Sequence, residues 1–175
     1  SRVFSNLNQL MYSASSMGQG IMAGSWGIYN AADGIITIDQ SEVTAQANTV
    51  KYDADASIAG GDLAGVFGVA NHTGQLTIIN STVNAKALNV IDTRIPNGGA
   101  LTSIIGAFGL YNTNGTMAVS NSSLIKAIAL NVDNIGYDVL TTQGLLDYVG
   151  AFGAYNDGGS IGNTATLDVK NTRVV

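Results

Sequence analysis

The stretch that decides the fold is Gly106-Ala107-Phe108-Gly109-Leu110-Tyr111-Asn112. The chain contains four versions of this heptapeptide, and the other three begin at Gly24, Gly65 and Gly150. Successive versions begin 41, 41 and 44 residues apart. A fixed period of this length is typical of repeat architectures, in which each repeat packs mainly on its neighbours.

Each heptapeptide is followed by a glycine-containing turn and a short run of alternating apolar and polar residues. In the second repeat the turn is Thr73-Gly74, the run begins at Leu76, and the polar pair Asn80-Ser81 precedes a further strand-like segment from Val83 to Val90. Alternation with a period of two indicates strands with one buried face. The sequence therefore predicts an all-β, right-handed parallel β-helix (β-solenoid) of four repeats of 41–44 residues. Each repeat forms either one wide coil, which we favour, or two coils of half that length.

Composition agrees with strands and tight turns. Charged residues make up 11% of the chain while glycine contributes 22 of its 175 residues, which leaves little material for exposed helices. The net charge is −5 and the few basic residues are scattered, so we expect no nucleic-acid partner. Cysteine is absent, which excludes disulfides and thiol chemistry. No apolar run is long enough to predict a membrane-spanning helix.

Residues 1–22 precede the first heptapeptide and have two interpretations. Leu7, Leu10, Met11 and Met17 have partly helical spacing, which predicts a short N-terminal capping helix started by Ser5. Alternatively, this segment is the last part of a preceding repeat. In either case, residues 23–175 form a single solenoid domain.

Three columns of like residues follow from superposing the repeats. We expect the aromatic column to stack inside the core and the asparagine column to form a ladder of amides. Strict alternation would turn the tyrosine column to the opposite side from the aromatic column, where it forms either a ligand-contact strip for sugars or an ordinary sheet surface. The columns are Trp26, Phe67, Phe108 and Phe152; Asn30, Asn71, Asn112 and Asn156; and Tyr29, Tyr111 and Tyr155.

The polar residues do not form a catalytic pattern, so we predict no enzyme. His72 is the only histidine and lies in a turn, and three lysines at similar phases predict an exposed row that discourages lateral sheet pairing. We expect no cofactor; Ca²⁺, which oxygen ligands suit, is the one alternative. The lysines are Lys86, Lys126 and Lys170, and the clustered carboxylates are Asp53, Asp55, Asp62, Asp133, Asp138 and Asp147.

The segment Val149-Gly150-Ala151-Phe152-Gly153-Ala154-Tyr155-Asn156-Asp157-Gly158-Gly159-Ser160-Ile161-Gly162-Asn163 resembles the GLUG repeat of bacterial cell-surface proteins. It departs from that pattern at Phe152-Gly153, where the GLUG repeat has a Leu-Val-Gly order. The resemblance implies a non-enzymatic structural or adhesive solenoid, secreted or at the cell surface. A carbohydrate-active β-helix enzyme or a tailspike-like polysaccharide-binding module is the alternative.

The two ends of the sequence also suggest a partner. Asn171-Thr172-Arg173 has nearly the phase of Asp92-Thr93-Arg94, and the chain opens on Ser1-Arg2-Val3-Phe4 at almost the same phase. Open solenoid ends present unpaired strand edges, which favour growth by addition. We therefore expect head-to-tail self-association through the solenoid ends, alongside a glycan or protein ligand of the surface.

Overall fold

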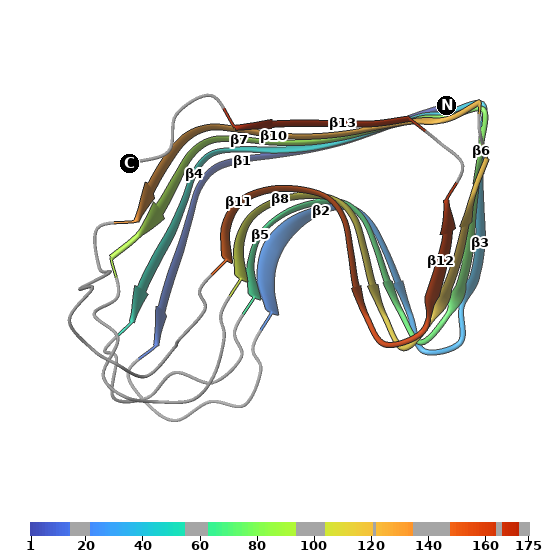
Figure 1. The fold of residues 1–175 in the computed structure, drawn as a ribbon, viewed down its shortest axis with the longest axis horizontal. Coiled ribbons are helices and arrows are strands. Elements are labelled where there is room, and N and C mark those ends of the chain that lie inside the picture. Colours follow the sequence, from blue (N-terminus) through green and yellow to red (C-terminus); the bar gives the residue numbers. More distant parts are fainter. Residues whose placement is uncertain are drawn as a thin grey trace.

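The structure is a computed structural model, which describes residues 1–14, 22–54, 63–93, 104–120, 122–134, 148–163 and 166–171. Within these ranges the chain forms thirteen strands and no helix. The strands lie in three parallel sheets, here called A, B and C (Figure 1). The all-β prediction is confirmed, and the parallel sheets fit a β-solenoid.

The chain passes from sheet B to sheet C to sheet A and then returns to sheet B. Sheet A has five strands: β1 (Arg2–Ala14), β4 (Glu42–Ala54), β7 (Thr82–Asp92), β10 (Leu124–Asn134) and β13 (Thr166–Asn171). Sheet B has four, which carry the heptapeptides: β2 (Met22–Ala31), β5 (Leu63–His72), β8 (Ile104–Thr113) and β11 (Tyr148–Asp157). Sheet C has four short strands: β3 (Ile35–Asp39), β6 (Gln75–Ile79), β9 (Thr116–Val119) and β12 (Ser160–Asn163).

Neighbouring strands in every sheet are one sequence period apart. The first glycines of the heptapeptides pair in one column, Gly24 with Gly65, Gly65 with Gly106, and Gly106 with Gly150. Each period therefore makes one wide coil rather than two narrow ones. In Figure 1 sheet B arches beneath sheet A, and sheet C closes the right side of the coil.

The N-terminal segment is a strand. β1 pairs with β4 in parallel from Arg2 opposite Glu42 to Ala14 opposite Ala54, so the predicted capping helix is wrong for residues 2–14. The pairing supports the other interpretation, in which this segment is the last strand of a preceding coil. Leu7 and Leu10 pack against the core cluster between sheets A and B, while Phe4 is 64% exposed. The neighbouring β4 thus imposes a strand on apolar spacing that local pattern alone leaves ambiguous.

Two clusters of buried residues fill the space inside the coil. The cluster between sheets A and B consists largely of alanine and valine, in columns such as Ala47, Ala87 and Ala129. The cluster where all three sheets meet includes Ile78, Val83 and Leu110. Small side chains in the first cluster allow sheets A and B to approach closely, whereas larger ones fill the wider corner.

The second glycine of the heptapeptide lies where sheet B approaches sheet A closely. A Cβ atom added to Gly68 would lie 2.4 Å from Cγ1 of Val83 and 2.8 Å from the carbonyl oxygen of Gly109. The strict alternation of side chains also breaks here. Val66 and Val69 both pack in clusters shared with sheet A, although only two residues separate them. From Val69 onward, each residue of the strand therefore faces the side opposite to the one that strict alternation predicts.

Candidate functional site

The aromatic column stacks along the whole height of sheet B. Ring centroids are 5.9 Å apart for Trp26 and Phe67, 4.7 Å for Phe67 and Phe108, and 4.9 Å for Phe108 and Phe152, with interplanar angles of 11–12°. Gly24 and Gly65, the first glycines of two heptapeptides, leave room for the ring of the next coil, since a Cβ atom on Gly65 would lie 2.7 Å from Cε2 of Phe108. The predicted stack is confirmed.

Its predicted position inside the coil is wrong. The cluster that contains the stacked rings consists only of sheet B residues, whereas the clusters on the other face of this sheet include sheet A. Phe67 and Phe108 are nevertheless fully buried. The rings therefore form a second apolar layer on the face of sheet B that is turned away from sheet A.

The tyrosine column lies on the same side as this aromatic stack, which corrects the prediction of opposite faces. Trp26 contacts Tyr29 edge-on with centroids 5.9 Å apart, and Phe67 contacts Tyr111 edge-on at 5.6 Å. The reason is the break in alternation at the second glycine. Tyr29 is 44% exposed, Tyr155 is partly buried and Tyr111 is buried, so the three rings do not form one continuous exposed strip. A ligand-contact role for these tyrosines stays a prediction.

Burial has a chemical consequence at Tyr111. It raises the pKa of the Tyr111 hydroxyl to about 12, and the nearby Asp157 carboxylate and Tyr155 contribute in the same direction. The Tyr111 ring also stacks on Tyr155, with centroids 5.7 Å apart. This hydroxyl therefore stays neutral over the physiological range.

The asparagine column forms the predicted amide ladder. Nδ2 of Asn30 donates to Oδ1 of Asn71 at 2.8 Å, Asn71 donates to Asn112 at 2.7 Å, and Asn112 donates to Asn156 at 2.7 Å. Nδ2 of Asn71 also donates to the carbonyl oxygen of Gly74 at 3.0 Å, and Asn30 and Asn112 repeat this contact with their own turns. The ladder thus ties each corner to its own turn and to the next coil.

All the amide-to-amide bonds of this ladder run in one direction. Among the described residues no donor reaches Oδ1 of Asn30 at the N-terminal end. At the other end, Nδ2 of Asn156 has its own turn carbonyl, at Gly159, as its partner, 3.3 Å away. One end of the ladder therefore offers an acceptor and the other end offers a donor.

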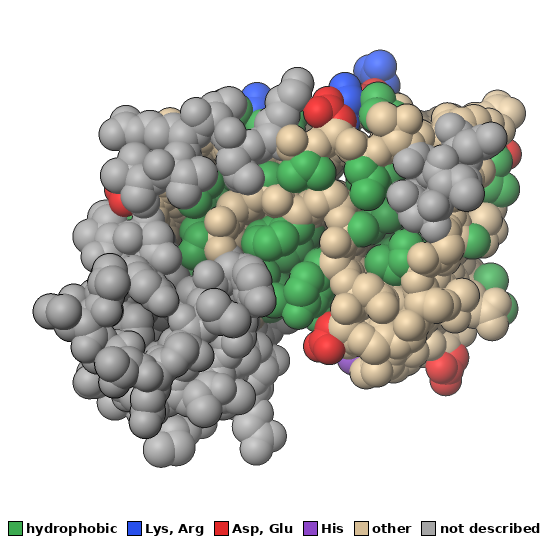
Figure 2. Space-filling model, in the orientation of Figure 1, with side chains coloured by type: hydrophobic (Ala, Val, Ile, Leu, Met, Phe, Trp, Pro, Cys, Tyr) green, Lys and Arg blue, Asp and Glu red, His purple; other side chains and the backbone are tan. Residues whose placement is uncertain are grey.

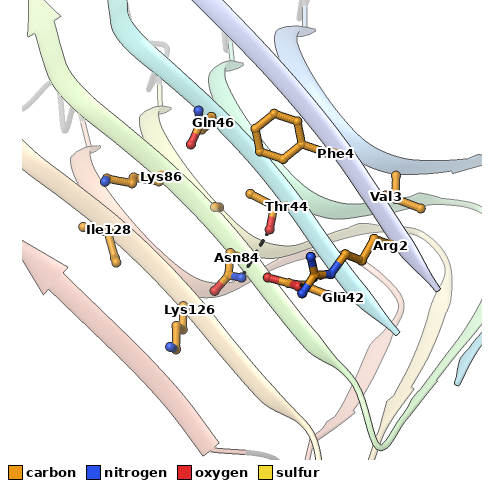
Figure 3. Close-up of a pocket in the computed structure, with 11 residues that line it drawn as sticks. Arg2, Val3, Phe4, Glu42, Thr44, Gln46, Asn84, Lys86, Lys126 and Ile128 are labelled. Carbon is orange, nitrogen blue, oxygen red and sulfur yellow. Dashed lines mark hydrogen bonds and ion pairs between the residues drawn. The ribbon is translucent and has the colours of Figure 1, made fainter. Parts of the chain in front are cut away.

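A shallow groove of about 560 Å³ lies on the outer face of sheet A (Figure 3). Its lining includes the exposed ring of Phe4, the ion pair of Arg2 with Glu42 at 3.1 Å, and Asn84, which donates to Oγ1 of Thr44 at 3.3 Å. The repeat pattern does not predict this groove, because its lining comes from four strands of sheet A. The signal available was the recurrence of polar residues at outward positions of sheet A.

The predicted lysine row is not straight. Lys86 pairs with Gln46 and Ile128, whereas Lys126 pairs with Asn84 and is displaced by two positions along the strand. The side chain of Lys170 lies outside the described residues. Lys86 and Lys126 both line the groove (Figure 3), which gives its surface a basic side.

The structure does not assemble the carboxylates into a site. His72 is exposed at the end of β5, and Asp133 is partly buried near the end of β10. The side chains of Asp53, Asp55, Asp62, Asp138 and Asp147 lie outside the described residues, so the carbohydrate-active alternative stays a prediction. In the part of the chain that the structure describes, no three His, Asp or Glu side chains are placed to hold a metal ion. Helices long and apolar enough to cross a membrane are absent from the same residues.

The exposed large hydrophobic side chains lie on the strands that form the two ends of the stack. In the described ranges they occur in β1, β2, β3 and β13 and in no strand between: Val3, Phe4, Met11, Tyr29, Ile35, Leu167 and Val169. Figure 2 views the molecule along the stack and shows hydrophobic side chains near the centre of an end face, with charged side chains at its margin. Because these side chains belong to edge strands, a further coil at either end would lie next to them.

Comparisons with known proteins found no matching family model, no similar curated protein and no similar solved structure. The candidate site consequently rests on the geometry of the columns, the groove and the two end faces.

Proposed function

We propose that this chain is a non-enzymatic structural β-solenoid that works by stacking end to end, as a subunit of a filament or as a segment of a surface stalk or adhesin. The observation that carries the proposal is the confinement of exposed large hydrophobic side chains to the end strands. Water-exposed apolar surface is costly, and covering it with another end face would stabilise an assembly.

The shape of the chain supports stacking. The solenoid axis is the shortest dimension of the molecule, because Figure 1 looks down that dimension and along the stack. Five strands at a spacing of about 4.8 Å span only about 24 Å along the axis. The part of the chain that the structure describes is therefore a slab with large end faces.

The two ends also match each other chemically. Trp26 closes the aromatic stack at one end and Phe152 at the other, so one outer ring could stack on the next. The donor of Asn156 likewise matches the acceptor of Asn30. A second copy of the chain would supply the ring and the amide that continue these two columns, so they require no other kind of partner.

The handedness of the coil and the location of the protein complete the proposal. The coil is right-handed, as crossover connections between parallel strands almost always are. The resemblance to GLUG repeats supports a secreted or cell-surface location in a bacterium.

Sedimentation velocity over a concentration series, with negative-stain electron microscopy, tests the stacking. We expect a concentration-dependent series of stacks, and Tyr29→Lys, which places a charge on the N-terminal end face, should shift the series toward monomer. Ala118→Lys is the matched control, because Ala118 is exposed on β9 in the middle of the stack. A wild-type chain that stays monomeric up to its solubility limit would refute the proposal.

The groove on sheet A supports an adhesive role as a second function. An exposed phenyl ring beside amide and lysine side chains is suited to an acidic polysaccharide, which the ring can contact while the lysines neutralise its charge. Calorimetric titration with a polyuronate should detect binding that weakens with salt and is lost when Lys86 and Lys126 are both changed to Ala. Equal heats for the wild-type and double-variant proteins would contradict this role.

A further inference from the structure

Among the asparagines in the part of the chain that the structure describes, Asn114 alone is followed by glycine. Asn114 and Gly115 form the corner between β8 and β9, where sheet B meets sheet C (Figure 1). Asn114 is exposed and has a φ of 55°. Its counterpart in the preceding coil is Thr73, which is also exposed and has a φ of 63°. The shape of the corner therefore does not require an asparagine.

The two groups that could react with each other at this corner are free of hydrogen bonds. Among the described residues, neither the side-chain amide of Asn114 nor the backbone N–H of Gly115 has a hydrogen-bond partner. Gly115 also lacks a Cβ atom, which leaves its nitrogen open to approach from the preceding side chain. An amide nitrogen that is neither bonded nor shielded loses its proton and attacks a neighbouring carbonyl carbon more readily than one in a strand ladder.

Asn80 provides the comparison inside the same molecule. It is exposed, has a φ of 49° and lies at the corner between β6 and β7. The next backbone nitrogen, that of Ser81, donates to Oγ of Ser123 at 3.3 Å. The two corners thus differ in whether the attacking nitrogen is held by a hydrogen bond and carries a side chain, while the exposure and backbone conformation of the asparagine are alike.

We propose that Asn114-Gly115 is a site of spontaneous covalent modification, at which Asn114 is converted to aspartate and isoaspartate. The nitrogen of Gly115 gives up its proton and bonds to Cγ of Asn114, while the bond from Cγ to Nδ2 breaks and Nδ2 leaves with a proton as ammonia. The cyclic imide that results takes up one water molecule. Opening at Cγ gives aspartate, and opening at the backbone carbonyl carbon gives isoaspartate, in which the main chain runs through Cγ.

Isoaspartate would loosen the corner from the next coil. The carbonyl oxygen of Gly115 accepts from the backbone nitrogen of Ser160 at 2.9 Å and from Nδ2 of Asn112 at 2.9 Å. The backbone nitrogen of Asn114 donates to the carbonyl oxygen of Asp157 at 3.1 Å. Isoaspartate adds one carbon to the main chain between these bonds, about 1.5 Å of extra length. A displacement of this size exceeds the range of about 2.7–3.2 Å for N–H···O bonds, so at least one of them is lost.

The modification is measured on the full chain during incubation in mildly alkaline buffer, in which the Gly115 nitrogen loses its proton more often. Tandem mass spectrometry of chymotryptic peptides locates the products and separates Asn114 from Asn97-Gly98, the other Asn-Gly pair of the sequence. Labelling by a protein isoaspartate methyltransferase identifies the isoaspartate form. We expect Asn114 to be converted roughly tenfold faster than Asn80, which corresponds to a barrier lower by about 1.4 kcal/mol.

Asn114→Thr is the matched control, because threonine occupies this corner in the preceding coil and cannot form the imide. Fresh wild-type and Asn114→Thr proteins are compared with incubated samples by urea denaturation. The unfolding midpoint of the wild type should fall as isoaspartate accumulates, whereas that of the control should stay where it began. Asn114→Asp, which has the charge without the longer main chain, should lose less than the incubated wild type.

Each part of the proposal has its own refutation. Conversion of Asn114 in the folded chain no faster than that of Asn80 would show that the free Gly115 nitrogen does not make this corner reactive. If isoaspartate forms but the unfolding midpoint stays unchanged, or falls equally in Asn114→Thr, the corner does not depend on the bonds of Gly115. All the contacts involved lie within one chain, so neither result depends on the stacking of copies.

Discussion

The asparagine ladder gives the sharpest test of what holds the coils together, through the change Asn71→Ala. Asn71 is fully buried, accepts from Asn30 at 2.8 Å, and donates to Gly74 at 3.0 Å and to Asn112 at 2.7 Å. A hydrogen bond contributes about 1 kcal/mol net, and a buried group left without its partner costs about 1–3 kcal/mol. Loss of these three bonds, with Oδ1 of Asn112 left unpaired, should lower the free energy of unfolding by about 3–5 kcal/mol.

Urea denaturation followed by circular dichroism measures this loss, and Asn156→Ala is the matched control. Asn156 occupies the same column at the exposed end, where its own donated bond is 3.3 Å long and water can replace the lost partner of Asn112. We expect the control to lose about 1 kcal/mol or less. Equal losses at the two positions would refute the assignment of stability to the buried amide bonds.

A second variant at the same position tests the direction of the ladder. Asn71→Asp keeps the acceptor that Asn30 uses but removes the donor that Gly74 and Asn112 require. An ionised carboxylate there would face two oxygen atoms in a buried setting, so Asp should destabilise at least as much as Ala despite its matching shape. A milder effect of Asp than of Ala at neutral pH would show that the donated bonds contribute little.

Three other predictions concern single residues. Gly68→Ala should lower the free energy of unfolding by about 1–3 kcal/mol, because the added methyl group overpacks against sheet A. Gly162→Ala should be near neutral in the same urea assay, because no atom of the described residues lies closer than 3.8 Å to the added Cβ. Phe108→Ala should cost about 3–5 kcal/mol and Phe4→Ala less than about 0.5 kcal/mol, and comparable losses would contradict the stacking geometry. Because burial raises the folded pKa of Tyr111 to about 12, the stability that the neutral hydroxyl contributes is complete below about pH 10 and is lost as the pH rises toward 12. The free energy of unfolding should fall over that range, and Tyr111→Phe should reduce the fall.

The sequence predicts much of this architecture because repetition amplifies weak local signals. Four copies of a heptapeptide at nearly equal spacing specify parallel strands, and a buried Asn at the same phase of each copy specifies an amide ladder. The stacked rings of Phe67 and Phe108 follow from the same superposition. These features depend on neighbours one period away, which the repeat itself identifies.

Features that depend on contact between different sheets were not predictable in this way. Alternation breaks at Gly68, where Val83 of sheet A leaves no space for a side chain, and the sequence does not state that the two sheets meet there. The tyrosines consequently face the same side as the phenylalanines. The N-terminal strand was ambiguous for a related reason, since only its pairing with β4 selects a strand over a helix. The groove on sheet A also requires side chains from separate coils.

The strands of the sheets and the segments that join sheet A to sheet B differ in how freely their lengths can change. The segments between each sheet A strand and the following sheet B strand, residues 15–21, 55–62, 94–103 and 135–147, increase in length along the chain, while the heptapeptides stay paired glycine to glycine. Insertions at this one point of the circuit thus leave the columns in register. Peptides grafted into these segments would therefore recur once per coil without disturbing the pairing of the heptapeptides.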